Sequence, residues 1–169
     1  MKIRQEQTTD YAEIYELVKS AFATAEVTDG DEQDYVNNLR KSDKYLPELA
    51  LVAEKDSRLI GHIMLTSTQI NCAENTFTEL LLSPLCVALS RRRTGVGAAL
   101  VNESFRLAKE MGYRAVFVVG NPQYYTRFGF KCVAEFGIVN EGDIPEQFVM
   151  AHELITGALK DKSGTVKIV

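Results

Sequence analysis

The sequence predicts a mixed α/β (α+β) fold in which helices cover both faces of one mixed sheet. Strand-like apolar runs come first as a meander, and further along the chain they alternate with an amphipathic helix. The chain has 169 residues, of which 46% are hydrophobic and 25% charged. This composition is typical of a globular protein with a buried core. We therefore expect one domain over residues 1–169.

The first elements are a short strand over residues 1–7 and a helix over residues 11–23. Thr9 or Asp10 is placed to cap that helix. A helix is predicted because apolar residues recur at a spacing of three and four. They are Ile14, Leu17, Val18 and Phe22.

A weaker helix over residues 31–41 follows, and we expect Pro47 to close that region. Two strand-like runs come next, over residues 48–55 and 58–70. They are separated only by Asp56-Ser57, which predicts a tight β-hairpin.

The apolar run over residues 78–89 is typical of a strand that is buried on both faces. Pro84 lies inside it, and proline cannot donate to a sheet ladder. We therefore expect this strand to carry a bulge or to lose a neighbour there. The helix predicted over residues 95–112 has an apolar face and ends at Gly112. That face comprises Val96, Leu100, Leu107 and Met111.

The last part of the chain predicts a buried strand over residues 115–119 and further strands over residues 131–136 and 146–154. Residues 165–169 form a final edge strand in this prediction. An exposed edge strand can pair with a second copy of the chain, so a homodimer is one expectation for the assembly.

Charge and cysteine content exclude several classes of protein. The net charge of −4 argues against a nucleic-acid partner, which needs a basic face. The three cysteines (Cys72, Cys86 and Cys132) lack CxxC or Cys/His spacing, so neither a disulfide framework nor a metal site is predicted. Apolar runs stay short of the roughly 20 residues that cross a bilayer, and the N-terminus is polar where a signal peptide would be apolar. We expect a cytoplasmic protein without a membrane partner.

A basic loop between the strand over residues 78–89 and the following helix carries the main functional signal. Arg91, Arg92 and Arg93 are followed by Gly95 and Gly97, which open the helix. Glycine turns, a helix N-terminus and basic side chains together predict an anion-binding loop. The P-loop and dinucleotide-binding patterns both fit poorly. Tight helix packing beside a solvated arginine run is the structural alternative.

The pattern Arg92-x-x-Gly95-x-Gly97 resembles the acetyl-CoA signature (Q/R)-x-x-G-x-(G/A) of the GNAT acetyltransferases. Tyr125-x-x-x-Gly129-Phe130 is similar to the Y-x-x-x-G-F element of the same superfamily. The strings PLCV and GNPQYYTRFGF resemble more narrowly its YhbS-like branch. The resemblance implies a mostly antiparallel sheet of about six to seven strands, with two central strands that splay apart. Pro84 is a local reason for such an interrupted ladder.

The resemblance also implies the cosubstrate, acetyl-CoA, and the residues that bind it. Backbone N–H groups of the loop would hold the pyrophosphate: Arg92, Arg93, Thr94, Gly95, Val96 and Gly97. The strand through Leu85, Cys86 and Val87 would bind the pantetheine arm. Asn121 is either a further CoA contact or a turn residue before Pro122.

The implied reaction is direct attack of an amine acceptor on the thioester, without a metal. Tyr125 is the candidate general acid for the departing thiolate, because a phenol and a thiol have comparable pKa values. Glu79 is a tentative base, although a surface carboxylate at a strand end is the alternative, and the usual catalytic position corresponds to Leu81. Covalent transfer through Cys86 is weighed against a buried core cysteine. Tyr124 is interpreted as a packing residue.

The acceptor amine stays unidentified. Acidic residues before the second helix either attract a cationic amine or only solubilise the loop. They are Glu26, Asp29, Asp31 and Glu32. His62 and His152 receive no role. The alternative function is a module of the same fold that binds acyl-CoA without turnover, as a sensor or interaction partner.

Overall fold

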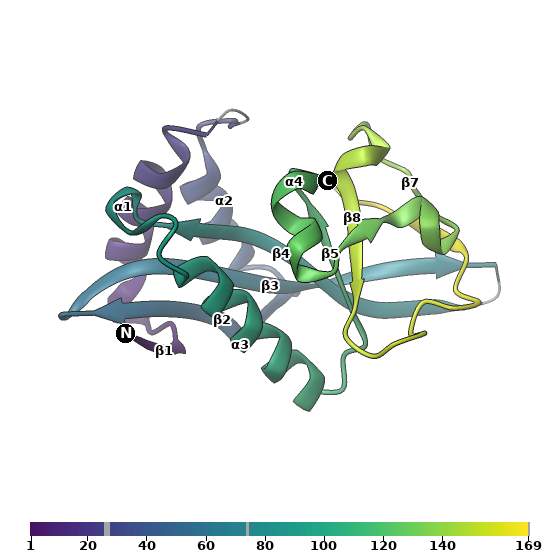
Figure 1. Ribbon diagram of the computed structural model, residues 1–169, viewed down its shortest axis with the longest axis horizontal. Coiled ribbons are helices and arrows are strands. Elements are labelled where there is room, and N and C mark those ends of the chain that lie inside the picture. The colour runs from purple at the N-terminus through teal and green to yellow at the C-terminus, as the bar shows by residue number, and fades with distance from the viewer. Residues whose placement is uncertain (26–27, 74, 169) are drawn as a thin grey trace. The chain divides into compact units, whose positions relative to one another are not determined.

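The computed structural model describes residues 1–25, 28–73 and 75–168 (Figure 1). The chain divides into two compact units. The first consists of Met1–Thr66 and Ser83–Leu107, and the second of Ser67–Leu82 and Ala108–Val169. Three elements run from one unit into the other: strand β3 (Arg58–Cys72), strand β4 (Thr76–Val87) and helix α3 (Val96–Glu110).

The strands of the first unit form the predicted meander. Strand β1 (Lys2–Gln5) pairs antiparallel with β2 (Tyr45–Lys55), which pairs antiparallel with β3. The β2–β3 hairpin turns at Asp56 and Ser57, whose φ angles are 53° and 59°. Two successive left-handed residues match the twist of a two-residue hairpin, which confirms that prediction.

Pro47 lies within β2 and does not end the region before it, so the sequence interpretation was wrong here. The β2–β3 register shifts between Tyr45 and Ala50, and Pro47 falls inside this irregular stretch. A proline has no N–H for the ladder, and strands accommodate it where regular pairing is interrupted.

Helices α1 (Tyr11–Phe22) and α2 (Glu32–Leu39) lie side by side in the first unit (Figure 1). Ile14, Leu17 and Val18 are buried as predicted. Asp10 occupies the position before α1 without a side-chain cap bond to it. Its carboxylate instead accepts hydrogen bonds from the Arg4 guanidinium at 2.6 Å and 3.0 Å and from the Gln7 N–H at 2.8 Å.

Helix α3 packs closely on β3 because position 61 is a glycine. A Cβ atom there would lie 2.9 Å from both Val96 Cγ1 and Leu100 Cδ1. Gly112 follows the helix with φ of 91°, as expected for a terminating glycine. Met111 is 40% exposed, contrary to its predicted place on the apolar face, because it lies beyond the last helical residue.

The second unit contains a mixed sheet. The N-terminal half of β4, at residues 80–82, pairs parallel with β5 (Ala115–Val119). Strand β5 pairs antiparallel with β8 (Val149–Glu153), and β8 pairs antiparallel with β6 (Lys131–Cys132). The end of β3 pairs with β9 (Gly164–Val166), whose other edge pairs parallel with β7 (Ile138–Asn140). The described residues contain nine strands in all, and the mixed α/β class is confirmed.

Two predictions for this part of the chain were wrong. The strand expected over residues 131–136 stops at Cys132, and a 3-10 helix covers Val133–Phe136. The C-terminal strand is paired on both edges, so within the described residues it offers no free edge for a second copy. Gly164 permits this close pairing, because a Cβ there would lie 2.1 Å from the Asn71 carbonyl oxygen.

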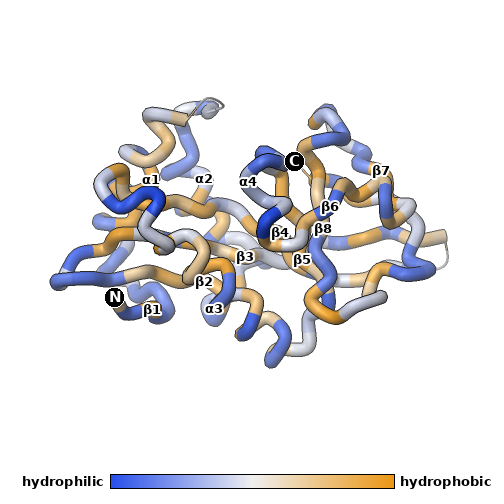
Figure 2. Tube along the Cα trace, in the orientation of Figure 1, coloured by the Kyte–Doolittle hydropathy of each residue, from blue (hydrophilic) through white to orange (hydrophobic). Residues whose placement is uncertain are grey.

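Each unit has its own apolar core. The first packs α1 and α2 on the sheet through residues that include Ile14, Val18, Val36, Val52 and Met64. The second is built around Ile70, Phe117, Val133, Ile138 and Val149. Figure 2 shows hydrophobic residues along the middle of β2, where residues 49–53 are all buried. In the part of the chain that the structure describes, no helix is both long and apolar enough to cross a membrane.

Candidate functional site

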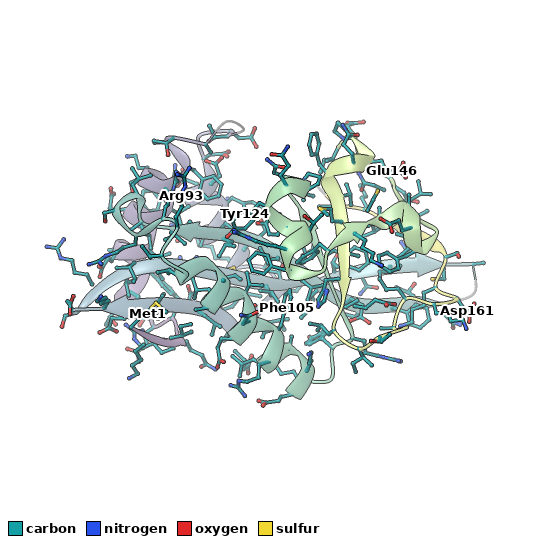
Figure 3. All side chains as sticks on the ribbon, in the orientation of Figure 1. Met1, Arg93, Phe105, Tyr124, Glu146 and Asp161 are labelled. Carbon is teal, nitrogen blue, oxygen red and sulfur yellow. The ribbon has the colours of Figure 1, made fainter. Side chains whose placement is uncertain are left out.

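The loop between β4 and α3 has an unusual backbone. Arg93 has φ of 60° and Gly95 has φ of 87°, so two left-handed residues flank Thr94. Residues 92–95 are all exposed, and Figure 3 labels Arg93 on this loop. A backbone that enters the left-handed region in this way gathers its N–H groups on one side and forms a concavity suited to an anion.

The N-terminus of α3 adds further donors to this loop. The first intrahelical hydrogen bond runs from the Ala99 N–H to the Gly95 carbonyl oxygen at 3.0 Å. The N–H groups of Val96, Gly97 and Ala98 precede that bond, and the helix dipole makes this end positive. At the other end of the loop, the Ala88 N–H donates to the Ile60 carbonyl oxygen at 2.9 Å. The loop is therefore held by β3 on one side and by α3 on the other.

The three arginines do not contribute alike. The Arg92 guanidinium donates from Nη2 to the Ala21 carbonyl oxygen at 2.7 Å and from Nη1 to Thr24 Oγ1 at 3.1 Å. Its side chain is thus bound to the end of α1, whereas the sequence interpretation took all three arginine side chains as positive charge for the anion. The Thr94 hydroxyl donates to the Arg91 carbonyl oxygen at 2.6 Å and closes the loop on itself.

The C-terminal part of β4, from Pro84 to Val87, leads into this loop. Pro84 and Cys86 are buried, whereas Leu85 and Val87 on the opposite face are only partly buried. The parallel ladder with β5 joins Leu80–Leu82 to Val116–Val118 and, in the described part of the chain, ends there. The prediction that the strand loses a neighbour near Pro84 is confirmed.

Cys86 is 4% exposed, and burial raises the pKa of its thiol to about 12. A thiol with such a pKa stays protonated and is a poor nucleophile near neutral pH. The structure therefore favours the interpretation of Cys86 as a core residue over covalent transfer through it.

Tyr125 lies in the second unit, at the end of the short helix α4 (Pro122–Tyr125). Its ring contacts the rings of Tyr124 and Phe130 edge-on, at centroid distances of 5.0 Å and 5.6 Å. Burial raises the pKa of the phenol above its ordinary value. Gly120 is required beside it, because a Cβ there would lie 2.2 Å from Tyr125 Cε2.

The second motif glycine also has a structural reason. Gly129 has φ of 85°, and a Cβ on it would lie 2.8 Å from His152 Nδ1. Phe130 is 2% exposed and packs against both Tyr125 and His152. His152 thus supports the turn, which explains its presence without a catalytic role.

Asn121 caps α4, since its side-chain Oδ1 accepts a hydrogen bond from the Gln123 N–H at 2.9 Å. This contact places Asn121 in the turn before Pro122. Tyr124 packs as expected, between the ring of Phe128 and the Arg127 guanidinium, which lies 3.9 Å from the centre of the Tyr124 ring. Figure 3 labels Tyr124.

Glu79 is 4% exposed, so its interpretation as a surface carboxylate was wrong. Its Oε2 accepts hydrogen bonds from the N–H groups of Arg114 and Ala115, both at 3.0 Å. Its Oε1 lies 3.8 Å from Lys162 Nζ. The carboxylate holds the start of β5 in place, and these contacts account for its charge and its burial.

Sequence reasoning missed a buried ionic network in the first unit. The Glu6 carboxylate accepts hydrogen bonds from Arg40 Nε at 2.8 Å and from the Tyr45 hydroxyl at 2.9 Å, and it lies 2.9 Å from His62 Nε2. Burial opposes the charge on Glu6, yet the bonds from Arg40 and His62 lower the pKa of the carboxyl to about 2. Burial lowers the pKa of His62. Glu6 and its three partners come from separate segments and leave no local pattern in the sequence.

The acidic segment before α2 is bonded internally. The Asp29 N–H donates to Glu32 Oε1 at 3.0 Å, and the Gly30 N–H donates to the Thr28 hydroxyl at 3.0 Å. Asp31 precedes the helix without a side-chain cap bond. Glu26, the other acidic candidate, lies outside the described residues.

Strand β4 of the mixed sheet leads through the loop into α3, and Tyr125 lies on a turn further along the chain. These are the features of an acetyltransferase fold. Residues 2–133 match the sequence model described as an acetyltransferase (GNAT) domain. The chain belongs to this GNAT family.

Known relatives and solved structures agree with that assignment. YhbS of Escherichia coli, an uncharacterised N-acetyltransferase, is 29% identical over 168 residues, covering 99% of this chain and 95% of YhbS. YjhQ, another uncharacterised N-acetyltransferase of Escherichia coli, is 29% identical over 82% of this chain and 75% of YjhQ.

Two crystal structures contain the cosubstrate or its product. The YhbS structure in complex with CoA superposes with a TM-score of 0.88 at 27% identity, covering 99% of this chain and 89% of that one. A GNAT acetyltransferase from Brucella melitensis in complex with acetyl-CoA superposes with a TM-score of 0.70 at 32% identity, covering 77% and 82% of the two chains.

Proposed function

We propose that this chain transfers the acetyl group of acetyl-CoA directly to a primary amine of a small molecule or protein. The observation that carries the proposal is the exposed loop in which left-handed Arg93 and Gly95 lead into the N-terminus of α3. Such a loop suits a pyrophosphate, whose charge the N–H groups and the helix dipole stabilise. The CoA and acetyl-CoA complexes of the two similar structures support the choice of cosubstrate.

In this proposal the amides of residues 92–97 hold the pyrophosphate, and the partly buried side of β4 at Leu85 and Val87 binds the pantetheine arm. Cys86 contributes backbone only, since its thiol is buried on the other face. Asn121 keeps its side-chain NH₂ group for a CoA contact while its oxygen caps α4. No metal is required.

The reaction joins the amine nitrogen to the thioester carbonyl carbon and then breaks the carbon–sulfur bond. We assign Tyr125 as the acid that donates its phenolic proton to the departing thiolate. Burial keeps the pKa of this phenol above its ordinary value, so it is protonated at neutral pH and can hydrogen-bond the departing thiolate, while the same shift makes it a weaker acid than a free phenol.

The attacking amine must lose a proton before or during attack, because its pKa lies near 10. Glu79 is a poor candidate for this base, since its Oε2 already accepts two backbone N–H groups. We therefore assign proton removal to water and the bulk solvent.

The first test is calorimetric titration with acetyl-CoA, using Gly95→Ala beside a matched control, Gly112→Ala. Both glycines have positive φ, of 87° and 91°, and at neither does an added Cβ meet an atom within 4 Å. The two variants therefore carry a similar backbone strain of about 1–2 kcal/mol. We expect acetyl-CoA affinity to fall at least about tenfold in Gly95→Ala only. Equal affinity of the two variants would exclude the loop as the pyrophosphate site.

The second test is release of free CoA thiol in the presence of small amines, aminoglycosides and peptides. Release with at least one amine supports the transferase. Binding without release across the whole panel would favour the alternative, an acyl-CoA-binding sensor or interaction module. Comparing acetyl-, propionyl- and succinyl-CoA in the same assay defines the acyl group.

A further inference from the structure

Arg92 belongs to two parts of the first unit at once. Its backbone opens the loop before α3, with φ of −63° and ψ of 149°, directly before left-handed Arg93. Its side chain reaches the end of α1, where it bonds the Ala21 carbonyl oxygen and the Thr24 hydroxyl. Residues that are 68 and 71 positions apart in sequence are thereby joined through one guanidinium.

The Arg92 guanidinium is the nearer of two side-chain donors to the Ala21 carbonyl oxygen. The Ala23 N–H bonds the Lys19 carbonyl oxygen, and the Ala25 N–H bonds that of Phe22 and not that of Ala21. The Ala21 carbonyl oxygen accepts a long hydrogen bond from the Thr24 hydroxyl at 3.4 Å and the shorter one from Arg92 at 2.7 Å. Ala21 itself is 4% exposed, so water has little access to this residue. A buried helix-terminal carbonyl needs a partner, and a cation at this end also complements the helix dipole.

We propose that Arg92 is a positioning residue that couples acetyl-CoA binding to the order of the C-terminal turn of α1. This inference rests on the proposed function, because it takes the loop over residues 92–97 as the pyrophosphate site. The pyrophosphate fixes the backbone of Arg92, and the fixed backbone holds the guanidinium on Ala21 and Thr24. An ordered α1 end in turn pre-orders the loop for the cosubstrate.

Such coupling is reciprocal. The free energy by which acetyl-CoA stabilises the α1 turn equals the gain in acetyl-CoA binding free energy that the ordered turn provides. Thr24 is the informative position, because it carries no charge and lies outside the loop. Its hydroxyl bonds both Arg92 and the Ala21 carbonyl oxygen, so a weakened cosubstrate affinity in Thr24→Val would be transmitted to the loop from the end of α1.

The test is a double-mutant cycle of Thr24→Val and Arg92→Gln, read as the dissociation constant of acetyl-CoA by calorimetry. Ser20→Ala is the control, because its hydroxyl bonds the Leu17 carbonyl oxygen on the same helix without reaching Arg92. We expect Thr24→Val to weaken binding about threefold and Arg92→Gln about tenfold. The double variant should be no weaker than Arg92→Gln alone. Additive losses would show that Arg92 acts on the phosphate and not through α1.

Hydrogen exchange gives a readout that a merely structural contact would not change. Acetyl-CoA should slow exchange at the amides of Ala23 and Ala25 in the wild type and have little effect on them in Arg92→Gln. The control amide is Arg40 N–H, which ends α2 by bonding the Val36 carbonyl oxygen at 3.2 Å. It should respond equally in both proteins.

The two proposals fail in different ways. A wild-type chain that does not bind acetyl-CoA refutes the proposed function and, with it, the coupling. Normal acetyl-CoA binding combined with an unaffected Thr24→Val variant refutes the coupling alone.

Discussion

Replacement of Glu79 by glutamine separates a catalytic carboxylate from a structural one. Two N–H groups, of Arg114 and Ala115, donate to the same oxygen, Oε2, at 3.0 Å. Glutamine keeps an oxygen there but removes the charge. A hydrogen bond to a charged group contributes about 1 kcal/mol more than a neutral one, so two such bonds give a loss of about 2 kcal/mol.

For a chain of 169 residues, this loss corresponds to a fall of about 4 to 8 °C in the melting temperature. The assay is thermal unfolding, measured beside kcat for thiol release at saturating acetyl-CoA. We expect Glu79→Gln to unfold earlier and to retain kcat within about threefold of the wild type. Glu79→Ala should lose more stability, because it leaves two N–H groups without an acceptor.

Glu153→Gln is the matched control for the structural effect. The Glu153 carboxylate also accepts two backbone hydrogen bonds, from Leu159 N–H at 2.7 Å and Gly157 N–H at 3.0 Å. These bonds go to two different oxygens, so glutamine keeps only one of them, and Glu153→Gln should unfold earlier with kcat unchanged. A Glu79→Gln protein that melts normally but loses about 100-fold or more in kcat would refute this reasoning and restore Glu79 as the base.

Other predictions concern the acid, its support and the buried network. Tyr125→Phe should lower kcat about 100-fold with little change in acetyl-CoA affinity, and wild-type turnover in that variant would remove the acid assignment. Gly120→Ala should lower kcat to a similar extent and also lower the melting temperature, because the new Cβ would lie 2.2 Å from the Tyr125 ring. An unchanged kcat in this variant would show that the position of the ring is unimportant for turnover. The pKa of Glu6 in the folded state is about 2, below its ordinary 4.5. The ionised carboxylate therefore contributes about 3 kcal/mol to the free energy of unfolding, which is present above pH 4.5 and is lost as the pH falls towards 2. Glu6→Gln should flatten this acid limb in urea unfolding, and an unchanged limb would contradict the assignment to Glu6. The pKa of His62 is lowered, so its stability contribution is likewise lost on acidification, beginning below its ordinary 6.5.

Local chemistry explains which parts of the fold could be predicted. The Asp56-Ser57 hairpin, the strand through Pro84 and the termination of α3 at Gly112 all follow from backbone preferences that a short window of sequence contains. The end of strand β6 at Cys132 could not be predicted from such local preferences. The run over residues 131–136 is apolar enough for a strand, and only tertiary packing converts its second half into a 3-10 helix.

The residues of the candidate site could likewise be predicted only where local chemistry determines them. Gly95 and Gly129 were visible in the sequence, because both adopt positive φ angles, which glycine tolerates best. The partners of Glu79, Arg92 and Glu6 were not visible. Each of these charged groups is contacted by residues between 34 and 83 positions away, a separation that no periodicity reports.

The interleaved division of the chain has a consequence for how this protein can be cut or recombined. Each unit is assembled from two separate stretches, and β3, β4 and α3 are shared between the units. No single break in the gene therefore yields either unit by itself. Fragment complementation at a site within residues 67–107 would divide both cores, whereas a circular permutation that opens the Asp56-Ser57 turn leaves every shared element whole.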